Sequence, residues 1–208
     1  MQSTFTIKEA LSYGWTKFRE NVKFLVLLTL GFFVAAGIIG FTGDKSLAAQ
    51  LLGMAVNLFA MLTFVRVGLK IHAGGKPEAK DIFAASWGMF GRYVLATLLF
   101  TVSYIAGFAA LILPGVYLVV RLGVFAFALV EEDMKPLESI KRSWSLTKGR
   151  FWDLLGFSVV LFLLNLLGAL ALGVGLLITS PVCLLATVYV YQSLKALPVK
   201  APDPHPAV

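Results

Sequence analysis

The 208-residue sequence has few of the residues on which catalytic and metal sites are usually built. Cys183 is its single cysteine, and His72 and His205 are its two histidines. One cysteine excludes a disulfide within the chain and a cysteine-based metal cluster. The sequence also lacks a phosphate-binding loop ending in Gly-Lys-Ser/Thr, an HExxH helix and a GxSxG turn. We therefore expect a protein that is not an enzyme and needs no cofactor.

Charged residues are also scarce. Asp, Glu, Lys and Arg make up 14% of the chain and hydrophobic residues 59%, whereas soluble domains carry roughly 25% charged residues. This balance indicates that lipid is the main solvent of the protein.

Three pairs of apolar segments predict an all-α integral membrane protein with six transmembrane helices. The expected spans are residues 22–41, 47–65, 93–113, 116–130, 152–172 and 176–191. Most reach the ~20 residues that cross the hydrocarbon core. A glycine-containing turn joins each pair, at 42–46, 114–115 and 173–175. A stretch of mixed charge precedes the first span, so we expect a membrane helix there and not a cleaved signal.

A polar, tryptophan-bearing segment precedes each pair. The tryptophans are Trp15, Trp87 and Trp144. An acidic residue precedes each tryptophan at the same spacing: Glu9, Asp81 and Glu138. A turn glycine follows each tryptophan at nearly the same spacing: Gly43, Gly115 and Gly173. We interpret this as three parallel repeats, 6–72, 78–134 and 135–197. Each combines an interfacial amphipathic helix with a transmembrane hairpin. Thr6 and Glu9 predict a capping box at the start of the first repeat.

The repeats form one expected membrane domain, residues 1–197. Residues 198–208 are rich in proline and predict a disordered cytoplasmic tail. Trp15, Trp87, Trp144 and Trp152 are interpreted as interface anchors, since tryptophan collects at membrane–water boundaries.

The distribution of lysine and arginine predicts the orientation. Nearly all of these residues flank the spans on one side, and Lys45 is alone on the other. The positive-inside rule then places both termini in the cytoplasm. The net charge of +7 is accordingly interpreted as contact with anionic lipid headgroups and not with nucleic acid. A protein partner or a homo-oligomer is a further possibility.

Three polar residues inside the spans are candidate lipid or substrate contacts. Arg121 follows the expected turn at Gly115 by less than two helical turns, and an intramembrane charge is a functional-site hypothesis by default. The alternative is that it snorkels outward or caps carbonyls and Asp44 at the turn. Asn57 and Asn165 either line a path or make interhelical hydrogen bonds.

One acidic run offers a weaker candidate. Glu131, Glu132 and Asp133 end the fourth span. They are predicted to form a solvated helix terminus, with a divalent cation site as the alternative.

The third repeat carries a family resemblance. Two segments resemble a broad group of bacterial six-span membrane proteins, namely ILPGVYLVVRLGVFAFALVEED and KPLESIKRSWSLTKGRFWDLLGF. The resemblance is strongest over residues 113–157. The group includes the YciC-like family and the membrane domain ahead of some glycerophosphodiester phosphodiesterases. The resemblance implies a bacterial inner-membrane protein. It implies no hydrolase activity, because the sequence holds no soluble segment long enough for the phosphodiesterase domain.

Two functions are therefore expected. The first is a non-enzymatic inner-membrane protein that acts in envelope or lipid homeostasis through lipid or partner-protein contacts. The second is a small transporter or lipid-moving protein, with a path between the hairpins around Arg121, Asn57 and Asn165.

Overall fold

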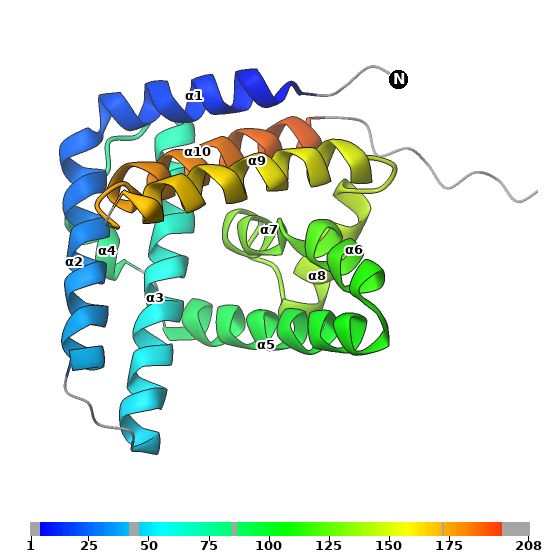
Figure 1. Ribbon diagram of the computed structural model, residues 1–208, viewed down its shortest axis with the longest axis horizontal. Coiled ribbons are helices and arrows are strands. Elements are labelled where there is room, and N and C mark those ends of the chain that lie inside the picture. The colour runs from blue at the N-terminus through cyan, green and yellow to red at the C-terminus, as the bar shows by residue number, and fades with distance from the viewer. Residues whose placement is uncertain (1–4, 42–45, 85–86, 172, 197–208) are drawn as a thin grey trace, which may run out of the picture.

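The computed structural model describes residues 5–41, 46–84, 87–171 and 173–196, in which every regular element is an α-helix (Figure 1). The helices run in chain order as α1 (Ile7–Glu20), α2 (Val22–Phe41), α3 (Leu47–His72), α4 (Lys80–Phe83), α5 (Trp87–Ala110), α6 (Ile112–Leu122), α7 (Phe125–Glu131), α8 (Pro136–Leu146), α9 (Phe151–Leu170) and α10 (Leu176–Lys195). The predicted turn at Gly43 to Lys45 and the tail from 198 onward lie outside the described residues.

Six stretches are long and apolar enough to cross a membrane. They are α2, α3, most of α5, the stretch Ile112–Glu131 that contains α6 and α7, α9 and α10. This confirms the predicted class, an all-α protein with six candidate spans. Helices α9 and α10 each begin within one residue of the predicted start, because the apolar run and the glycine turn between them mark where each helix begins.

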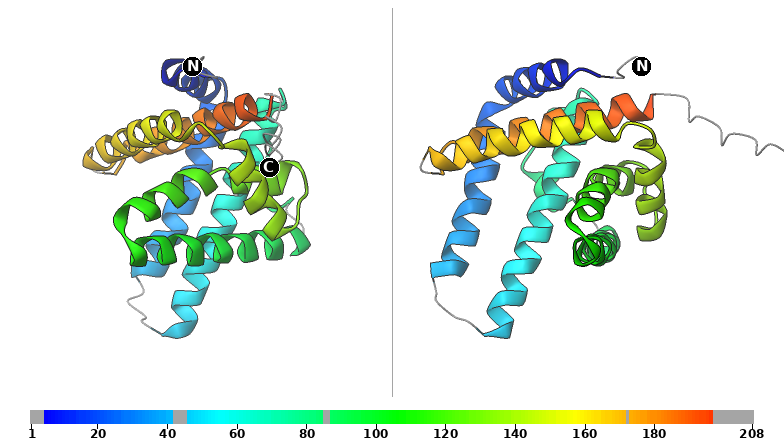
Figure 2. Two further views of the ribbon diagram at one scale, coloured as in Figure 1. Left: turned by 90° about the vertical axis from the view of Figure 1, so that its right-hand side faces the viewer. Right: turned by 45° about the vertical axis from the view of Figure 1, so that its right-hand side comes forward.

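The hairpins do not run in one direction. In the right-hand view of Figure 2, α5 is seen nearly end-on, α9 and α10 lie across the view, and α2 and α3 run down it. The sequence had suggested three equivalent hairpins side by side. The structure instead places α2–α3, α5–α6 and α9–α10 around a shared centre.

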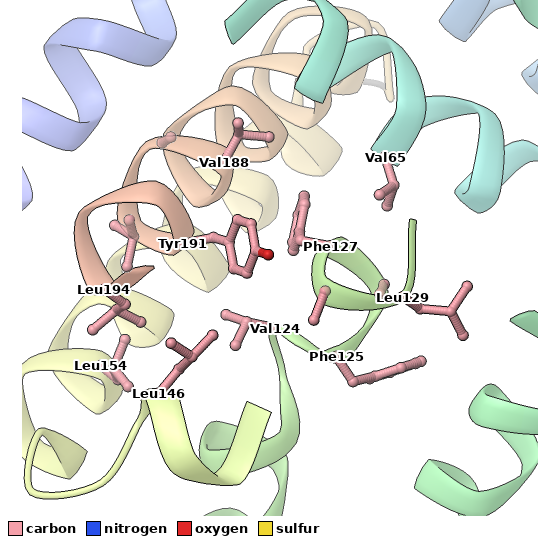
Figure 3. Close-up of a cluster of buried hydrophobic side chains, with 14 of the residues drawn as sticks. Val65, Val124, Phe125, Phe127, Leu129, Leu146, Leu154, Val188, Tyr191 and Leu194 are labelled. Carbon is pink, nitrogen blue, oxygen red and sulfur yellow. The ribbon is translucent and has the colours of Figure 1, made fainter. Parts of the chain in front are cut away.

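That centre is the short helix α7. Phe125, Phe127 and Leu129 are at most 6% exposed and belong to one apolar cluster. Figure 3 shows side chains of α3, α8, α9 and α10 directed at them, among them Val65, Leu146, Leu154 and Tyr191. The ring centroids of Phe127 and Tyr191 lie 5.6 Å apart. A helix that packs on several neighbours in this way is apolar on most faces, as α7 is up to its last residue, Glu131.

The return of the second hairpin corrects the prediction. Residues 116–130 were expected to form one helix after a turn at Pro114–Gly115. The turn lies at Leu111, which is extended (φ −175°, ψ 160°), and Pro114 and Gly115 belong to the first turn of α6. Proline is tolerated there because its missing N–H has no partner to lose. A side chain on Gly115 would meet the ring of Phe108, so glycine permits the close contact with α5. The chain breaks again at Gly123 and Val124.

The predicted amphipathic helix of the second repeat also needs correction. Only the four residues of α4 are helical there, and Trp87 already belongs to α5. The start of α5 packs into the fold, since the rings of Phe90 and Phe59 are 6.2 Å apart. This contact packs the start of α5 on α3.

Helix α1 packs on protein where lipid contact was expected. Ala10, Gly14 and Phe18 are buried against the rest of the chain. A Cβ on Gly14 would lie 2.6 Å from the carbonyl oxygen of Val182 in α10. Small residues thus let the two backbones approach. The predicted capping box is confirmed, with both bonds between Thr6 and Glu9 at 3.2 Å.

The three acids found at matching positions share one role. Glu9, Asp81 and Glu138 each accept a hydrogen bond from a backbone N–H three residues earlier, of Thr6, Glu78 and Lys135. The distances are 3.2, 2.6 and 3.3 Å. Each carboxylate therefore satisfies a donor that the first helical turn leaves unpaired.

Candidate functional site

Arg121 lies in the last turn of α6 and is 3% exposed. Its guanidinium carbon is 4.3 Å from the ring centroid of Trp144 in α8 and 5.7 Å from that of Tyr117. Both distances are within the range of a cation–π interaction. The guanidinium therefore contacts two aromatic rings, which also pack edge to face on each other with their centroids 5.8 Å apart.

The backbone of Arg121 is fixed as well. Its carbonyl oxygen accepts hydrogen bonds from Ser143 Oγ at 3.0 Å and Thr147 Oγ1 at 2.9 Å. Carbonyls in the last turn of a helix lack partners within the helix. The hydroxyl groups of Ser143 and Thr147 in α8 therefore supply the hydrogen-bond donors that the Arg121 carbonyl lacks at the end of α6.

These contacts correct the expected position of Arg121. The side chain does not reach outward to the turn; it lies beside α8. The turn before α6 lies at Leu111, four residues before the expected turn at Gly115, so Arg121 is farther along its helix than predicted. Asp44, the suggested partner, lies outside the described residues. Within the described ranges the guanidinium has no ion pair, and its Nε is buried without a hydrogen-bond partner.

A cavity of about 720 Å³ lies between the three hairpins. Residues of α2, α3, α5, α7 and α10 line it, and Asn57 is among them. A second cavity of about 610 Å³ shares Phe32 and Val56 with the first. Its walls are apolar and include the exposed ring of Trp87. Both volumes fall in the ~300–1,000 Å³ range of small-molecule sites.

Some polar side chains that line the larger cavity make hydrogen bonds within the protein, and others make none. The hydroxyls of Thr29 and Thr187 donate to carbonyls of their own helices, at 2.7 and 2.8 Å. Thr97 Oγ1, in contrast, is buried without a partner. Asn57, which is exposed, and Ser180, which is half-buried, also make no hydrogen bond within the described part of the chain. These three unpaired residues come from α3, α5 and α10.

Asn165 lies outside both cavities and links α9 to α10. Its Nδ2 donates to the Leu161 carbonyl at 3.0 Å, and its Oδ1 accepts from Thr179 Oγ1 at 3.3 Å. This is the packing alternative that the sequence had left open. The structure therefore separates the three predicted contact residues: Asn57 lines a cavity, Asn165 joins two helices, and Arg121 packs on α8.

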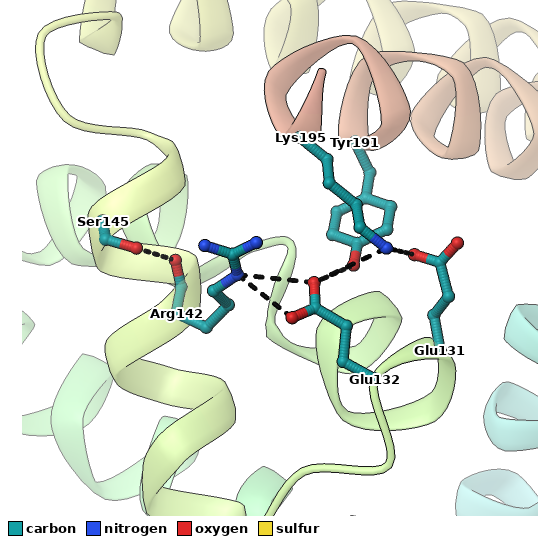
Figure 4. A network of polar contacts seen from close by, with 6 residues as sticks. All are labelled: Glu131, Glu132, Arg142, Ser145, Tyr191 and Lys195. Carbon is teal, nitrogen blue, oxygen red and sulfur yellow. Dashed lines mark hydrogen bonds and ion pairs between the residues drawn. The ribbon is translucent and has the colours of Figure 1, made fainter. Parts of the chain in front are cut away.

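A polar network at the end of α7 was missed from the sequence (Figure 4). Glu132 is 3.2 Å from Arg142 of α8 and accepts a hydrogen bond from the Tyr191 hydroxyl at 3.0 Å. Glu131 accepts from Lys195 at 3.0 Å and from Gln192 at 2.7 Å, both in α10.

The third acid of the run, Asp133, pairs with Arg92 of α5 at 2.6 Å. The acidic run lies at the end of α7, with Glu131 and Asp133 exposed, and its acids also join this end to three other helices. Its acids were visible in the sequence, but nothing there indicated which cations they meet. No group of three or more His, Cys, Asp and Glu suited to a metal occurs in the described ranges.

The four tryptophans all keep a large exposed surface. The exposed fractions are 48% for Trp15, 89% for Trp87, 40% for Trp144 and 78% for Trp152. Of the two histidines, His72 accepts or donates a hydrogen bond with the Tyr13 hydroxyl at 2.8 Å, and His205 lies outside the described residues.

Comparison with known proteins places the chain among uncharacterised relatives. A family model described as a domain of unknown function (DUF7847) matches residues 60–207. An uncharacterised protein of Mycobacterium tuberculosis, Rv2560, is 26% identical over 99% of this chain and 74% of its own length. The uncharacterised protein Mb2590 of Mycobacterium bovis is 25% identical over the same shares. No solved structure matches. The YciC-like and phosphodiesterase-associated groups remain a resemblance, because none of these matches carries their names.

Proposed function

The chain belongs to the DUF7847 family of unknown function, and we propose that it is a non-enzymatic protein of the bacterial inner membrane. It acts in envelope or lipid homeostasis by binding membrane lipids, with anionic headgroups on the cytoplasmic side. Both termini are cytoplasmic in this proposal.

The observation that carries the proposal is a set of exposed cations without acidic partners. Lys8, Arg19 and Lys23 form one group at α1 and the start of α2; Lys141 and Lys148 form another around the link from α8 to α9. None of them has an ion pair within the described ranges. Trp15 lies within the first group, and Trp144 and Trp152 flank the second. Cations beside exposed tryptophan suit a headgroup layer, where each adds about 1 kcal/mol near an anionic surface.

The repeat supports the same orientation. A carboxylate that accepts from a backbone N–H three residues earlier precedes a tryptophan in each repeat, at Glu9, Asp81 and Glu138. In our proposal the helices that start after Thr6 and Lys135 face the cytoplasm as interfacial segments, and the second repeat has no separate interfacial helix.

Two reporters test the orientation. Alkaline phosphatase fused to the C-terminus should be inactive, and the same enzyme inserted at Asp44 should be active. An active C-terminal fusion together with an inactive insertion at Asp44 would contradict the proposed orientation.

Lipid analysis tests the headgroup contacts. The Lys8→Gln/Arg19→Gln variant should purify with less anionic lipid than the wild-type protein. Lys17→Gln/Lys80→Gln is the matched control, since it removes the same charge from cations that already pair with Glu20 and Glu78. Equal losses of anionic lipid in both variants contradict specific headgroup contacts.

A small transporter or lipid-moving protein is the second candidate function, and the cavities favour it. The path would then run along Asn57, since Arg121 does not line either cavity. Arg121→Ala separates the two readings of that residue. Loss of abundance alone supports a structural role in the α6–α8 contact, and altered lipid asymmetry at normal abundance supports the path.

A further inference from the structure

We propose that the larger cavity binds one acyl chain of a neutral glycerolipid together with the ester carbonyl that joins the chain to glycerol. This deepens the proposed lipid contact but concerns a different site, inside the protein and not at its cationic surface. The argument starts from the three unpaired polar side chains.

Asn57, Thr97 and Ser180 line one cavity and come from the three different hairpins. A polar group in hydrocarbon without a hydrogen bond costs several kcal/mol. Thr29 and Thr187 in the same walls show the ordinary remedy, a bond to the preceding turn of their own helix. The unpaired three therefore suit a ligand that supplies their partner.

The chemistry of the three groups identifies that partner. The amide NH₂ of Asn57 and the hydroxyls of Thr97 and Ser180 all donate hydrogen bonds, so a carbonyl acceptor in the cavity suits them. The residues that line the cavity include no Asp, Glu, Lys, Arg or His. A charged headgroup would be left without a counter-ion inside, whereas an ester carbonyl is neutral and accepts two hydrogen bonds.

The shape of the space suits a chain. Phe33, Phe64, Phe100 and Phe125 line the larger cavity, and the smaller cavity shares Phe32 and Val56 with it. Apolar walls of this kind gain about 0.8 kcal/mol for each buried CH₂ group when the alternative is water. In a bilayer the chain gains little from burial alone, so the three donors determine which part of the lipid is held.

Photo-crosslinking tests the site directly. The full-length protein, purified in micelles, is irradiated with a diacylglycerol that carries a diazirine in one acyl chain, and the adducts are mapped by mass spectrometry. Adducts should concentrate on residues that line the two cavities. Asn57→Leu should lower the adduct yield about fivefold, the effect of one lost hydrogen bond of about 1 kcal/mol. Ser103→Ala should not, because Ser103 lies in α5 outside the cavities and bonds to Leu99.

Two further measurements need no variant. Cys183 lines the larger cavity and is the single cysteine, so added diacylglycerol should slow its alkylation by N-ethylmaleimide. A dialkylglycerol ether, which has the chains without the carbonyl, should protect much less. Adducts spread evenly over the outer helix faces, or no protection of Cys183 by the ester, overturn the site. Equal protection by ester and ether overturns the role of the carbonyl. Diacylglycerol carries no charge, so these outcomes are independent of anionic headgroup binding.

Discussion

At the end of α7, Glu131 and Glu132 each contact a cation from another helix. In the large cavity, Asn57, Thr97 and Ser180 make no hydrogen bond within the described part of the chain, although the Tyr93 hydroxyl lies beside Thr97. Both regions place polar side chains among apolar helices. Only the first is complete without a ligand.

The difference separates two uses of polarity in one membrane protein. A satisfied network stabilises the arrangement of the helices that contribute to it, and removing a member leaves the others unpaired. A set of polar groups without hydrogen-bond partners lowers stability, and it is retained where a ligand supplies the missing partners. Mutations in the two regions should therefore have opposite consequences for stability and for lipid binding.

The largest loss of stability should follow Glu132→Leu. This change leaves Arg142 and the Tyr191 hydroxyl without their shared acceptor and removes a second carboxylate, at 3.8 Å, from Lys195. Breaking a buried pair costs about 3–5 kcal/mol, and Glu132 is partly exposed, so we expect about 2 kcal/mol. Denaturant unfolding in micelles, followed by circular dichroism, measures it.

Asp133→Asn is the matched control in the same acidic run. The Asp133 side chain is 69% exposed, so its pair with Arg92 should contribute less than about 1 kcal/mol. Equal losses in the two variants would contradict the importance of the network around Glu132.

A smaller loss should follow Thr147→Val. The Arg121 carbonyl then keeps only the hydroxyl of Ser143 as a donor from α8. We expect the free energy of unfolding to fall by about 1 kcal/mol, the usual net value of one hydrogen bond. Ser145→Ala is the control, since Ser145 is exposed and bonds to Arg142 within its own helix. A loss for Ser145→Ala as large as that for Thr147→Val would count against the role assigned to α8.

In the cavity the same kind of change should cost almost nothing. Asn57→Leu removes an amide that has no partner to lose, so the free energy of unfolding in lipid-free micelles should change by less than about 0.5 kcal/mol or rise. A clear loss of stability would mean that Asn57 is part of the packing. The cavity and the α7 network would then not differ in kind.

The smallest effect concerns pH. The Lys70 ammonium, 2.7 Å from Asp81, lowers the pKa of that carboxyl, and the backbone N–H of Glu78 adds to the shift. A lowered folded-state pKa contributes stability above the unfolded pKa, which is lost as the pH falls through the folded value. Wild-type protein should therefore lose its advantage over Asp81→Asn between neutral and strongly acidic pH. The pair is partly exposed, so the difference should stay below about 1 kcal/mol. An advantage that grows on acidification contradicts the sign.

Local sequence signals were sufficient for much of the fold. The span lengths, the cap at Thr6 and the ends of α9 depend on residues close in sequence. The break after α6 does not, because Ser143 and Thr147 bond to Arg121 from another helix. Thr147 is fully buried although it is polar, because its hydroxyl bonds to the Arg121 carbonyl.

The packing of α1 on α10 could not be predicted from the spacing of hydrophobic residues either. The large apolar residues of α1 recur at helical spacing, but the buried contact with α10 uses Ala10 and Gly14. Small residues add little to an apolar pattern, although they determine how closely two helices approach. The sequence marked Asn57 as a midspan amide. That it shares a cavity with Thr97 and Ser180 follows only from the directions of three hairpins.

Thermal unfolding with a neutral lipid tests the contrast most directly. Wild-type protein and Asn57→Leu are unfolded in micelles with and without diacylglycerol at matched concentrations. A ligand that binds only the folded state raises the Tm in proportion to its affinity. We predict a rise in Tm for the wild-type protein and a much smaller rise for Asn57→Leu, with equal Tm values before lipid is added. An equal rise in both proteins would contradict the account, because the unpaired groups of the cavity would then not recognise the lipid.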